Sequence, residues 1–289
     1  MLLVIDVGNT NTVLGVYEGK KLLAHWRLTT EHSQTVDEYG ILARNLLALA
    51  GLDASKIDGV IVSSVVPPLN ATLKEMAERY FHTAPLFVEP GIKTGIRIRY
   101  DNPQEVGADR IVNAVAAYEK YGGPCIVVDF GTAITFDAIS RQGDYLGGVI
   151  APGIGVSAEA LFTRTARLPR VSLQPPPKLI GTNTIASIQS GLYHGFLALV
   201  DGVLAQMKAE LGKDTKAIAT GGEAQLVANN ARQLDLVDEF LTLDGLRILY
   251  ARNLPRSKTV VDQPAGESQH KPGQRPASAR MRRTDRPRS

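Results

Sequence analysis

The chain has 289 residues, 44% of them hydrophobic and 21% charged, which is the composition of an ordinary globular protein and not of a fibre. This length allows two packed domains of roughly 100 to 150 residues each. Charged residues interrupt every apolar stretch before it reaches the roughly 20 residues needed to span a bilayer, so we expect a cytoplasmic protein without membrane contact. The opening run, MLLVIDVGNT, predicts a buried strand rather than a signal peptide.

The net charge of +3 is unevenly distributed along the chain. Residues 255–289 contain nine Lys or Arg and three acidic residues, so this segment carries +6 and the body carries −3. A mildly acidic body argues against nucleic-acid binding as the main function. The segment is rich in Pro, Gly, Ser and Arg, and we predict that it is a disordered tail because it has too few large apolar residues to bury. A contact of the tail with nucleic acid or a membrane surface is the less favoured alternative.

The first part of the chain shows alternating strand and helix patterns. Gly8 to Asn9 and Gly19 to Lys20 are hairpin signals, and Gly51 is placed where a helix should end. These signals and the hydrophobic periodicity predict strands over 2–7, 11–19 and 21–28, a helix over 35–50, a strand over 59–65, a helix from 67 to about 80 and a strand over 86–88. A further helix is expected over about 107–121.

After a pair of glycines, Gly122 and Gly123, the same pattern begins again. We expect strands over 125–130, 132–139 and 144–152, a helix over 156–168, a helical region over about 183–211, a strand over 216–222 and a short helix from about Glu223. Prolines 175–177 mark a connecting loop. The two halves therefore follow one plan.

The repeat is clearest in the first hairpin of each half, where VIDVGNTNTVLGV can be laid over VVDFGTAITFDAI. The overlay places Asp6 over Asp129, Gly8 over Gly131 and Thr12 over Thr135. Such turns suit phosphate, because glycine lets backbone N–H groups come close, Thr and Asn add donors, and the aspartate can hold a hydrated cation. Two facing copies would grip a polyphosphate between two domains. We therefore predict two duplicated α/β domains, each a mixed β-sheet flanked by helices, over residues 1–115 and 116–254.

Other site motifs fit less well. The segment GVYEGKK, residues 15–21, is one spacer residue short of a P-loop and lacks the hydroxyl residue after the lysine. Residues 153–158 match the dinucleotide pattern G-x-G-x-x-A, but the acidic residue expected about 20 positions later is missing. These glycines are better explained by a helix N-terminus that comes close to a ligand. The single Cys125 predicts a core thiol, and the five histidines lack metal-ligand spacing.

Three segments, DVGNTNTV (6–13), YDNPQEVGADRIVNA (100–114) and DFGTAITFD (129–137), resemble the type III pantothenate kinases, which belong to the superfamily of acetate and sugar kinases, heat-shock proteins and actin. GGVIAPG and ATGGEA are also similar to the family, and the resemblance extends from Met1 to about Asn253. It implies two actin-like (ribonuclease H-like) domains and the ATP-dependent phosphorylation of pantothenate to 4′-phosphopantothenate, the first step of coenzyme A biosynthesis. It also implies a homodimer.

The resemblance assigns roles to the two hairpins. ATP is expected to bind through Thr132 and through the first hairpin, whose residues are Asp6, Val7, Gly8, Asn9, Thr10, Asn11, Thr12 and Val13. Asp6 is expected to position Mg²⁺ through water. Asp129 is expected to bind a monovalent cation, K⁺ or NH₄⁺.

The family also implies a pantothenate site and a general base. Pantothenate is expected to contact Tyr100, Gly107, Ala108, Asp109, Arg110 and Thr184. Asp109 is expected to be the general base, and Thr184 is expected to reach the site from the partner subunit.

Physical chemistry supports a catalytic role for Asp109 without requiring it. Phosphoryl transfer to an alcohol needs positioning, charge neutralisation and one carboxylate that accepts the hydroxyl proton. Asp109 lies in the first turn of a predicted helix, after a glycine that would leave room for substrate. An N-terminal capping acid paired with Arg110 explains it equally well from the sequence alone. Arg110 could bind the pantothenate carboxylate through its planar fork or form a surface ion pair.

Two other functions remain open at this point. A sibling acetate or sugar kinase would share the ATP site but use another acceptor, and the GADR segment, residues 107–110, argues against it. A regulatory nucleotide-binding protein, an accessory factor for transcription, is the non-enzymatic alternative. The presence of Asp6, Asp109 and Asp129 favours retained chemistry.

Overall fold

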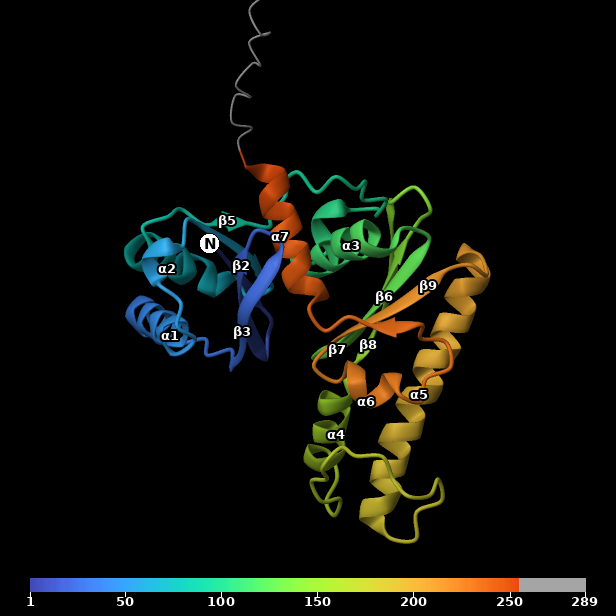
Figure 1. Ribbon diagram of the computed structural model, residues 1–289. Helices are drawn as coiled ribbons and strands as arrows, with labels where there is room; N and C mark the ends of the chain where they lie inside the picture. Colours follow the sequence, from blue (N-terminus) through green and yellow to red (C-terminus); the bar gives the residue numbers. More distant parts are fainter. Residues whose placement is uncertain (255–289) are drawn as a thin grey trace, which may run out of the picture. The chain divides into compact units, whose positions relative to one another are not determined.

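The structure is a computed structural model that describes residues 1–254 (Figure 1). The tail that we predict to be disordered, residues 255–289, lies outside the described residues. Within residues 1–254, no helix has the length and apolar content needed to cross a membrane.

The first sheet has five strands in the order β3-β2-β1-β4-β5. Its strands are β1 (Leu2–Val7), β2 (Asn11–Glu18), β3 (Lys21–Thr29), β4 (Gly59–Ser64) and β5 (Leu86–Phe87). The first three strands are antiparallel neighbours, whereas β4 and β5 continue the sheet in parallel with β1. Helices α1 (Val36–Leu49) and α2 (Asn70–Phe81) cover one face, and a capping box between Thr35 and Glu38 starts α1.

The second sheet repeats this plan in the order β10-β9-β6-β7-β8. Its strands are β6 (Cys125–Phe130), β7 (Ala133–Ile139), β8 (Tyr145–Pro152), β9 (Lys216–Gly221) and β10 (Leu236–Val237). Antiparallel and parallel pairings recur at the matching positions. Helices α4 (Ile154–Thr163), α5 (Thr184–Leu211) and α6 (Ala224–Ala228) accompany this sheet. The predicted class, duplicated mixed sheets flanked by helices, is confirmed.

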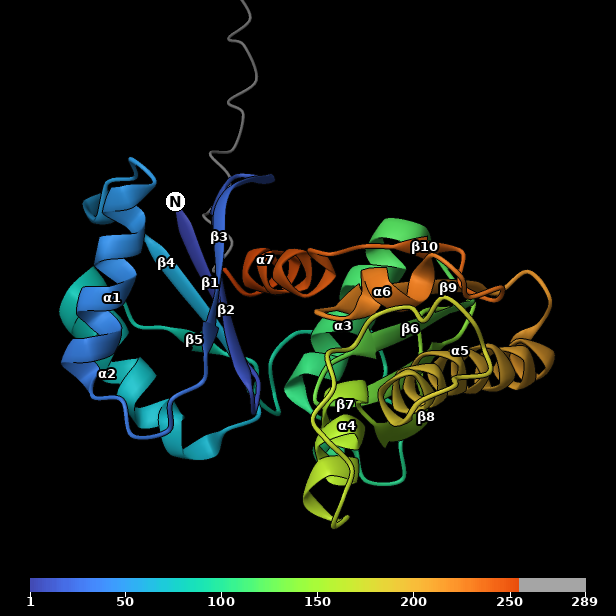
Figure 2. The same cartoon turned by 90° about the horizontal axis from the view of Figure 1, so that it is seen from below.

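Two helices, α3 (Ala108–Tyr121) and α7 (Leu241–Asn253), lie between the two sheets (Figures 1 and 2). Their apolar side chains form one core with the first sheet, and α3 also packs on the second sheet. The helices come into backbone contact at Gly245, where an added Cβ would lie 2.4 Å from the carbonyl oxygen of Val112. The expected domain boundary at residue 115 falls inside α3 and stays a prediction.

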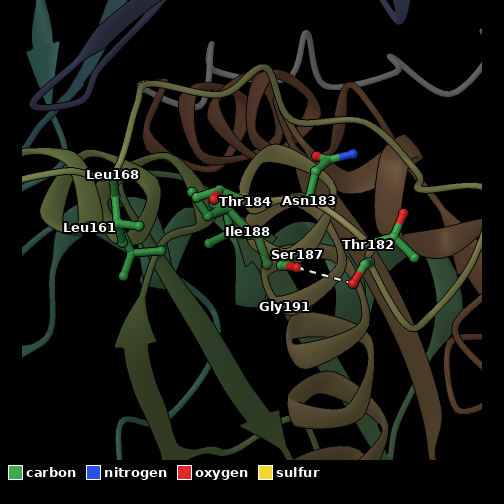
Figure 3. Close-up of a pocket in the computed structure, with 10 residues that line it drawn as sticks. Leu161, Leu168, Thr182, Asn183, Thr184, Ser187, Ile188 and Gly191 are labelled. Atoms are coloured by element: carbon green, nitrogen blue, oxygen red, sulfur yellow. Dashed lines mark hydrogen bonds between the residues drawn. The ribbon is translucent and has the colours of Figure 1, made fainter.

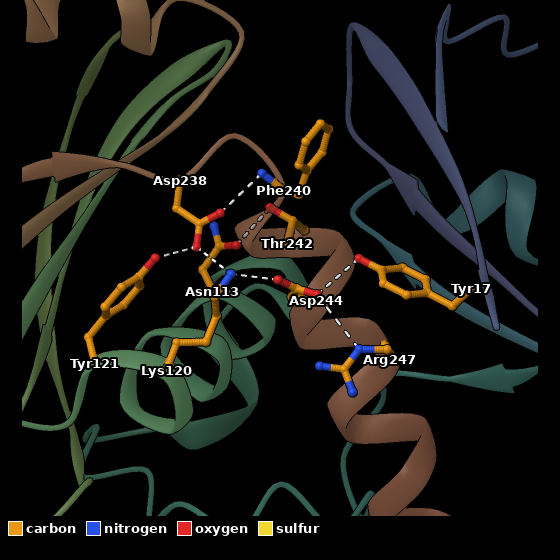
Figure 4. Close-up of polar contacts among 9 residues, drawn as sticks. All are labelled: Tyr17, Asn113, Lys120, Tyr121, Asp238, Phe240, Thr242, Asp244 and Arg247. Atoms are coloured by element: carbon orange, nitrogen blue, oxygen red, sulfur yellow. Dashed lines mark hydrogen bonds and ion pairs between the residues drawn. The ribbon is translucent and has the colours of Figure 1, made fainter. Parts of the chain in front are cut away.

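A polar network joins α3 and α7 to both halves (Figure 4). The Lys120 ammonium lies 2.6 Å from a carboxylate oxygen of Asp238 and 2.5 Å from one of Asp244. Asp244 also accepts a hydrogen bond from the hydroxyl of Tyr17 on β2, and Asp238 accepts one from Tyr121. The carboxylates are mostly buried, so the shared Lys120 cation offsets part of the cost of removing them from water.

The structure departs from the predicted elements mainly after residue 150. Helix α4 begins at Ile154 and ends at Thr163, whereas the apolar pattern predicted a helix over 156–168. Leu168, the last residue of the predicted helix, lies instead in a segment without regular structure. Its apolar side chain packs against the core of the second sheet. Strand β10 and helix α7 were not predicted, because β10 has two residues and Gly245 interrupts the helical pattern of α7. Short 3₁₀ helices lie at Ala54–Lys56, Pro67–Leu69 and Pro103–Glu105.

The backbone contact at Gly245 gives a stability prediction. Gly245→Ala should lower the free energy of unfolding by about 2 kcal/mol, because the added methyl group collides with α3 and forces the helices apart. Gly202→Ala, at a helical glycine of α5 with no atom within 4 Å of an added Cβ, should raise it by about 0.5 to 1 kcal/mol. Chemical denaturation followed by circular dichroism measures both, and equal effects would contradict the close approach.

Candidate active site

A cleft of about 480 Å³ opens between the two sheets, at the carboxyl ends of β1 and β6. Asp6 and Asp129 lie near the ends of these strands, at matching positions of the two sheets. The first hairpin lines the cleft with Asp6, Gly8, Asn9, Thr10, Asn11 and Val13. Thr132 and Thr135 line it from the second hairpin, and Asp109 lines it from α3.

The two hairpins face each other directly. The hydroxyl groups of Thr10 and Thr132 lie 2.8 Å apart and share a hydrogen bond. Each turn is closed by a glycine N–H, since Gly8 donates to Asn11 and Gly131 donates to Ala133. The facing arrangement that the repeat predicted is therefore present.

The overlay of the repeat is wrong by one residue after the turn. Asp6 pairs with Val13, whereas Asp129 pairs with Thr135, because the second turn is one residue shorter. Thr135 therefore corresponds to Val13 and faces the cleft, whereas Thr12 is buried on the opposite face and shares a hydrogen bond with Thr30. Val7 is also buried there, among the residues packed on α1 and α2, so neither Val7 nor Thr12 presents a side chain to the cleft.

Three carboxyl groups gather at the floor of the cleft. Burial, the charge of Asp109 and the charge of Asp129 raise the pKa of Asp6 to about 7. Burial and the charge of Asp109 likewise raise the pKa of Asp129 to about 7. Burial raises the pKa of Asp109 above its usual range. Such a cluster is unfavourable without cations, so its ionised form is suited to receiving them.

Asp129 is held by a residue that the sequence did not reveal. The Asn113 amide on α3 donates a hydrogen bond of 2.9 Å to Asp129, and its carbonyl oxygen accepts one of 2.7 Å from Thr242 on α7. Asn113 is fully buried, so both polar groups of its side chain are satisfied inside the protein. The sequence feature that could have identified Asn113 is its polar amide among the apolar residues of the predicted helix.

Asp109 lies in the first turn of α3, as predicted, but its surroundings differ from both expectations. Its carboxylate accepts a hydrogen bond from the backbone N–H of Arg110, whose guanidinium points elsewhere. The Arg110 side chain therefore pairs with Asp137 and not with Asp109, so the prediction of a capping acid paired with Arg110 is wrong about the partner. A Cβ on Gly107 would lie 2.6 Å from the Asp109 carboxylate, so this glycine makes room for the acid itself.

Arg110 is buried and paired with Asp137, so the alternative of a surface ion pair is wrong. Its Nε donates to Asp137 at 2.7 Å, and the same carboxyl group accepts hydrogen bonds from Tyr145 and Thr135. One terminal nitrogen of Arg110, Nη2, is buried without a hydrogen-bond partner among the described residues. The sequence did not single out Asp137 or Tyr145, although a charge inside the apolar strand 132–139 was a signal.

The remaining residues of the predicted pantothenate site take different places. The ring of Tyr100 lies 6.3 Å from the ring of Tyr145, beside the Arg110 cluster. Ala108 packs on the core between the sheets. Thr184 lies in a separate open hollow at the start of α5, with Leu161, Asn183 and Ile188 (Figure 3). The structure does not bring Thr184 to the cleft of its own chain.

The glycines of residues 153–158 serve α4 and its neighbours. Gly153 caps α4, and an added Cβ would lie 2.4 Å from the carbonyl oxygens of Gly131 and Thr132. It therefore lets the helix approach the second hairpin rather than a ligand. Gly155 and Val156 do line the cleft.

The acids of the cleft do not form a complete metal cage. Among residues 1–254, no group of three or more His, Cys, Asp or Glu side chains is arranged to hold a metal ion by itself. Mg²⁺ commonly takes one or two carboxylates and completes its shell with water and phosphate oxygens. The donor set of Asp6, Asp109 and Asp129 fits that mode of binding, because it supplies oxygen ligands beside a phosphate-sized cleft.

Solved structures share this fold. A protein from Campylobacter jejuni, described as a Baf family transcriptional activator, aligns with a TM-score of 0.55 at 24% identity over 87% of this chain and 98% of its own. A protein from Sinorhizobium meliloti, described as a 2-dehydro-3-deoxygalactonokinase, aligns with a TM-score of 0.56 at 12% identity over 91% of this chain and 100% of its own. The duplicated sheets and their facing aspartate hairpins define a protein of the actin-like fold.

The sequence comparisons identify the family. The type III pantothenate kinase profile matches residues 2–206. The type III pantothenate kinase of Koribacter versatilis is 60% identical over 263 residues, which cover 88% of this chain and 96% of that protein. The type III pantothenate kinase of Myxococcus xanthus is 59% identical over 253 residues, covering 88% of this chain and 99% of that protein. The chain belongs to the type III pantothenate kinase family.

The crowded carboxyl groups give a prediction about pH. The folded protein holds the Asp6 proton more tightly than the unfolded chain, whose pKa is near 3.8, so Asp6 lowers stability as pH rises from about 4 to 7, and the full penalty remains above 7. Asp6→Asn removes this penalty. Without divalent ions or nucleotide, we expect the substitution to stabilise the protein by at least about 1 kcal/mol more at pH 8 than at pH 5.

Denaturation at the two pH values, in the presence of a chelator, measures this difference. Asp53→Asn is the control, because Asp53 is exposed and a hydrogen bond from Ser55 lowers the pKa of its carboxyl group. Its contribution is therefore constant between pH 5 and pH 8. If Asp6→Asn changed the free energy of unfolding equally at pH 5 and pH 8, the prediction would be wrong, because burial and the neighbouring carboxyl groups would then not raise the pKa of Asp6.

Proposed function

We propose that the protein transfers the γ-phosphate of ATP to the 4′-hydroxyl group of pantothenate in the cytoplasm, which begins coenzyme A biosynthesis. The observation that carries the proposal is a cleft in which two hydrogen-bonded aspartate hairpins meet the carboxylate of Asp109, in a chain of this family. The reaction needs charge neutralisation, an in-line arrangement and one proton acceptor. The cleft offers groups suited to each requirement.

ATP binds along the two hairpins in this proposal. The turn residues present glycine backbone, the amides of Asn9 and Asn11, and the hydroxyl groups of Thr10 and Thr132 to the cleft. These groups are hydrogen-bond donors that suit phosphate oxygens. The hydrogen bond between Thr10 and Thr132 keeps both hydroxyl groups at one place, so a single triphosphate can contact both hairpins.

Two cations would complete the nucleotide site. Asp6 would hold Mg²⁺ through water, and Asp129 would hold K⁺ or NH₄⁺, in agreement with their place in the lining of the cleft and the tendency of each to resist ionisation without a cation. Such cations would neutralise charge that develops on the transferring phosphoryl group. Asn113 keeps the Asp129 carboxylate in one orientation, and Asp109 and Asp6 lie close enough for their charges to interact.

Pantothenate lies against the other end of the floor, near the start of α3. Its carboxylate binds the free Nη2 of Arg110, which is already oriented by Asp137 and lies beside Tyr100 and Tyr145. A buried guanidinium nitrogen without a partner favours an anionic ligand, because leaving it unpaired is costly. Gly107 and Ala108 place the substrate next to Asp109. The hydroxyl group then lies between Asp109 and the γ-phosphate.

Asp109 accepts the proton of that hydroxyl group as it attacks phosphorus. Burial raises the pKa of the carboxyl group, which makes it a stronger base than an exposed aspartate. The Arg110 backbone N–H and the space provided by Gly107 hold the carboxylate in place. The proton stays on the Asp109 carboxyl group, the bond between the γ-phosphorus and the bridging oxygen breaks, ADP leaves, and the phosphoryl group is bound to the alcohol oxygen.

A homodimer completes the pantothenate pocket through Thr184 of the partner. Among residues 1–254, nine of the twelve exposed large hydrophobic side chains lie between Leu146 and Ile185, on β8, α4, the following loop and the start of α5. An apolar region of this kind is typical of a surface that pairs with another copy. Thr184 belongs to the same region and lies outside the cleft of its own chain. A two-fold contact would bring it to the partner's cleft.

The decisive assay mixes purified protein with ATP, Mg²⁺, K⁺ and pantothenate and detects 4′-phosphopantothenate by mass spectrometry. A panel of acetate and sugar acceptors tests the sibling kinases. Product from pantothenate alone supports the proposal. ATP binding without any phosphorylated product would instead support a regulatory nucleotide-binding protein.

Removal of the proposed general base, Asp109, should slow phosphoryl transfer without weakening ATP binding. Asp109→Asn is expected to lower turnover by about 10² to 10⁴, because the amide cannot accept the proton, while ATP affinity changes little. Steady-state kinetics and nucleotide titration measure the two quantities. Asp214→Asn, which removes an exposed acid paired with Arg141, is the control and should retain turnover. Unchanged turnover in Asp109→Asn would assign the base to another residue.

The shared pocket predicts recovery of activity in mixed dimers. Asp109→Asn and Thr184→Val chains, each defective alone at low pantothenate, should form heterodimers in which one site combines the intact Asp109 of one chain with the intact Thr184 of the other. Co-expression should then restore about a quarter of wild-type activity, since half of the dimers carry one intact site. No recovery, with dimers present by sedimentation, would place Thr184 in the site of its own chain.

A further inference from the structure

The cleft is strongly acidic before any ligand binds. Among the described residues that line it, six carry carboxyl groups and one, Arg27, carries a cationic side chain. The six are Asp6, Asp109, Asp129, Glu159, Glu223 and Glu239. A polyphosphate would be repelled by such a surface unless cations accompany it, so the position of Arg27 matters for how the nucleotide binds.

Arg27 reaches the cleft from the first sheet. It lies on β3 opposite Val13 of β2, and directly paired residues of antiparallel strands share one face of the sheet. Val13 lines the cleft, so Arg27 projects from the same face. Its neighbour two positions back on β3, His25, packs its ring 4.6 Å from Phe240 just before α7, which shows that this face of β3 is turned toward the second half of the chain.

The guanidinium extends toward the glycine turn that follows β9. An added Cβ on Gly222 would lie 3.2 Å from Nη1 of Arg27, so the side chain spans from β3 to the backbone of the second half. Gly221, Gly222 and Glu223 of this turn line the cleft together with Arg27. Arg27 is therefore placed at the point where both halves meet, on the side formed by β3 and this turn.

Arg27 has no hydrogen bond or ion pair with another described residue, although six carboxyl groups share its cleft. Its charge nevertheless lowers the pKa values of Asp6 and Asp129 against the larger effect of burial. An unengaged guanidinium that faces both hairpin acids is available to an anion held between them. Its planar fork matches two phosphate oxygens at once, which an ammonium group does not.

We infer that Arg27 binds the polyphosphate of ATP from the first sheet and is a further substrate-binding residue of this enzyme. The inference rests on the proposed function only for the identity of the nucleotide. Arg110 is held by Asp137 beside Tyr145, does not line the cleft, and in the proposed function binds pantothenate. Arg27 contributes the protein's own positive charge to the nucleotide end, in addition to the bound cations.

The test compares Arg27→Gln with Arg27→Lys and with Lys21→Gln, a control that removes one positive charge from the exposed start of the same strand. Affinities for ATP, ADP and adenosine are measured by calorimetry in Mg²⁺ and K⁺, and thermal melting checks folding. Loss of a charge-assisted contact should weaken ATP binding by about 10-fold to 100-fold in Arg27→Gln. Arg27→Lys should lie between the glutamine variant and the wild type, and Lys21→Gln should match the wild type.

Adenosine separates a phosphate contact from a general change in the cleft. Its affinity should be unchanged in Arg27→Gln, and the KM for pantothenate should change by less than about twofold, whereas the KM for ATP should rise with the dissociation constant. Unchanged ATP affinity in Arg27→Gln, or an equal loss for adenosine and ATP, would overturn the inference. The calorimetric affinities, unlike the KM values, do not require turnover, so a wild-type protein that forms no 4′-phosphopantothenate would refute the proposed function and leave the binding test intact.

Discussion

The packing of α3 against α7 between the two sheets is the constraint on which the site depends. The helices touch backbone to backbone at Gly245, and Lys120 on α3 binds Asp244 on α7 and Asp238 before it. Since α3 and α7 share a core with the first sheet and α3 also packs on the second, this pair sets the separation of the sheets. That separation in turn brings the Thr10 and Thr132 hydroxyl groups to 2.8 Å and leaves a cleft above Asp109.

The same packing creates the electrostatic character of the site. Three carboxyl groups are brought together below the hairpins, and burial and mutual repulsion raise the pKa values of Asp6 and Asp129 to about 7. The protein tolerates this cluster because its neighbours restrict it, with Asn113 bound to Asp129 and the Arg110 backbone bound to Asp109. In the proposed function, charge that is unfavourable in the free protein becomes favourable when cations and phosphate bind, which is the common relation between stability and function at active sites.

Duplication gives the two halves similar strands but different tasks. The longer first turn carries two asparagines and a threonine, whereas the second is one residue shorter and places Thr135 where the first half has Val13. On the same face of β7 as Thr135, Asp137 joins Arg110 and Tyr145 in a buried cluster that has no counterpart in the first hairpin. In the proposed function, the nucleotide end and the acceptor end therefore arise from symmetric and asymmetric parts of one duplicated fold.

The sequence by itself determined most of the strands and helices, because hydrophobic periodicity, hairpin glycines and capping residues are local signals. It also identified the repeat and most of the hairpin residues that line the cleft, since an aspartate at the end of a buried strand followed by a glycine turn is legible without coordinates. The exact match between the halves required the strand registers, because a one-residue difference in turn length reverses which side chains face the cleft.

Only the tertiary structure decided the partners of side chains that are distant in sequence. Arg110 meets Asp137, Asn113 joins Asp129 to Thr242, and Arg27 crosses from β3 to the turn after β9. These contacts depend on how α3, α7 and the two sheets pack, and packing is a property of the whole chain. Helix α7 shows the same limit, because its interior glycine weakens the local helical signal and is favourable only where another helix needs that space.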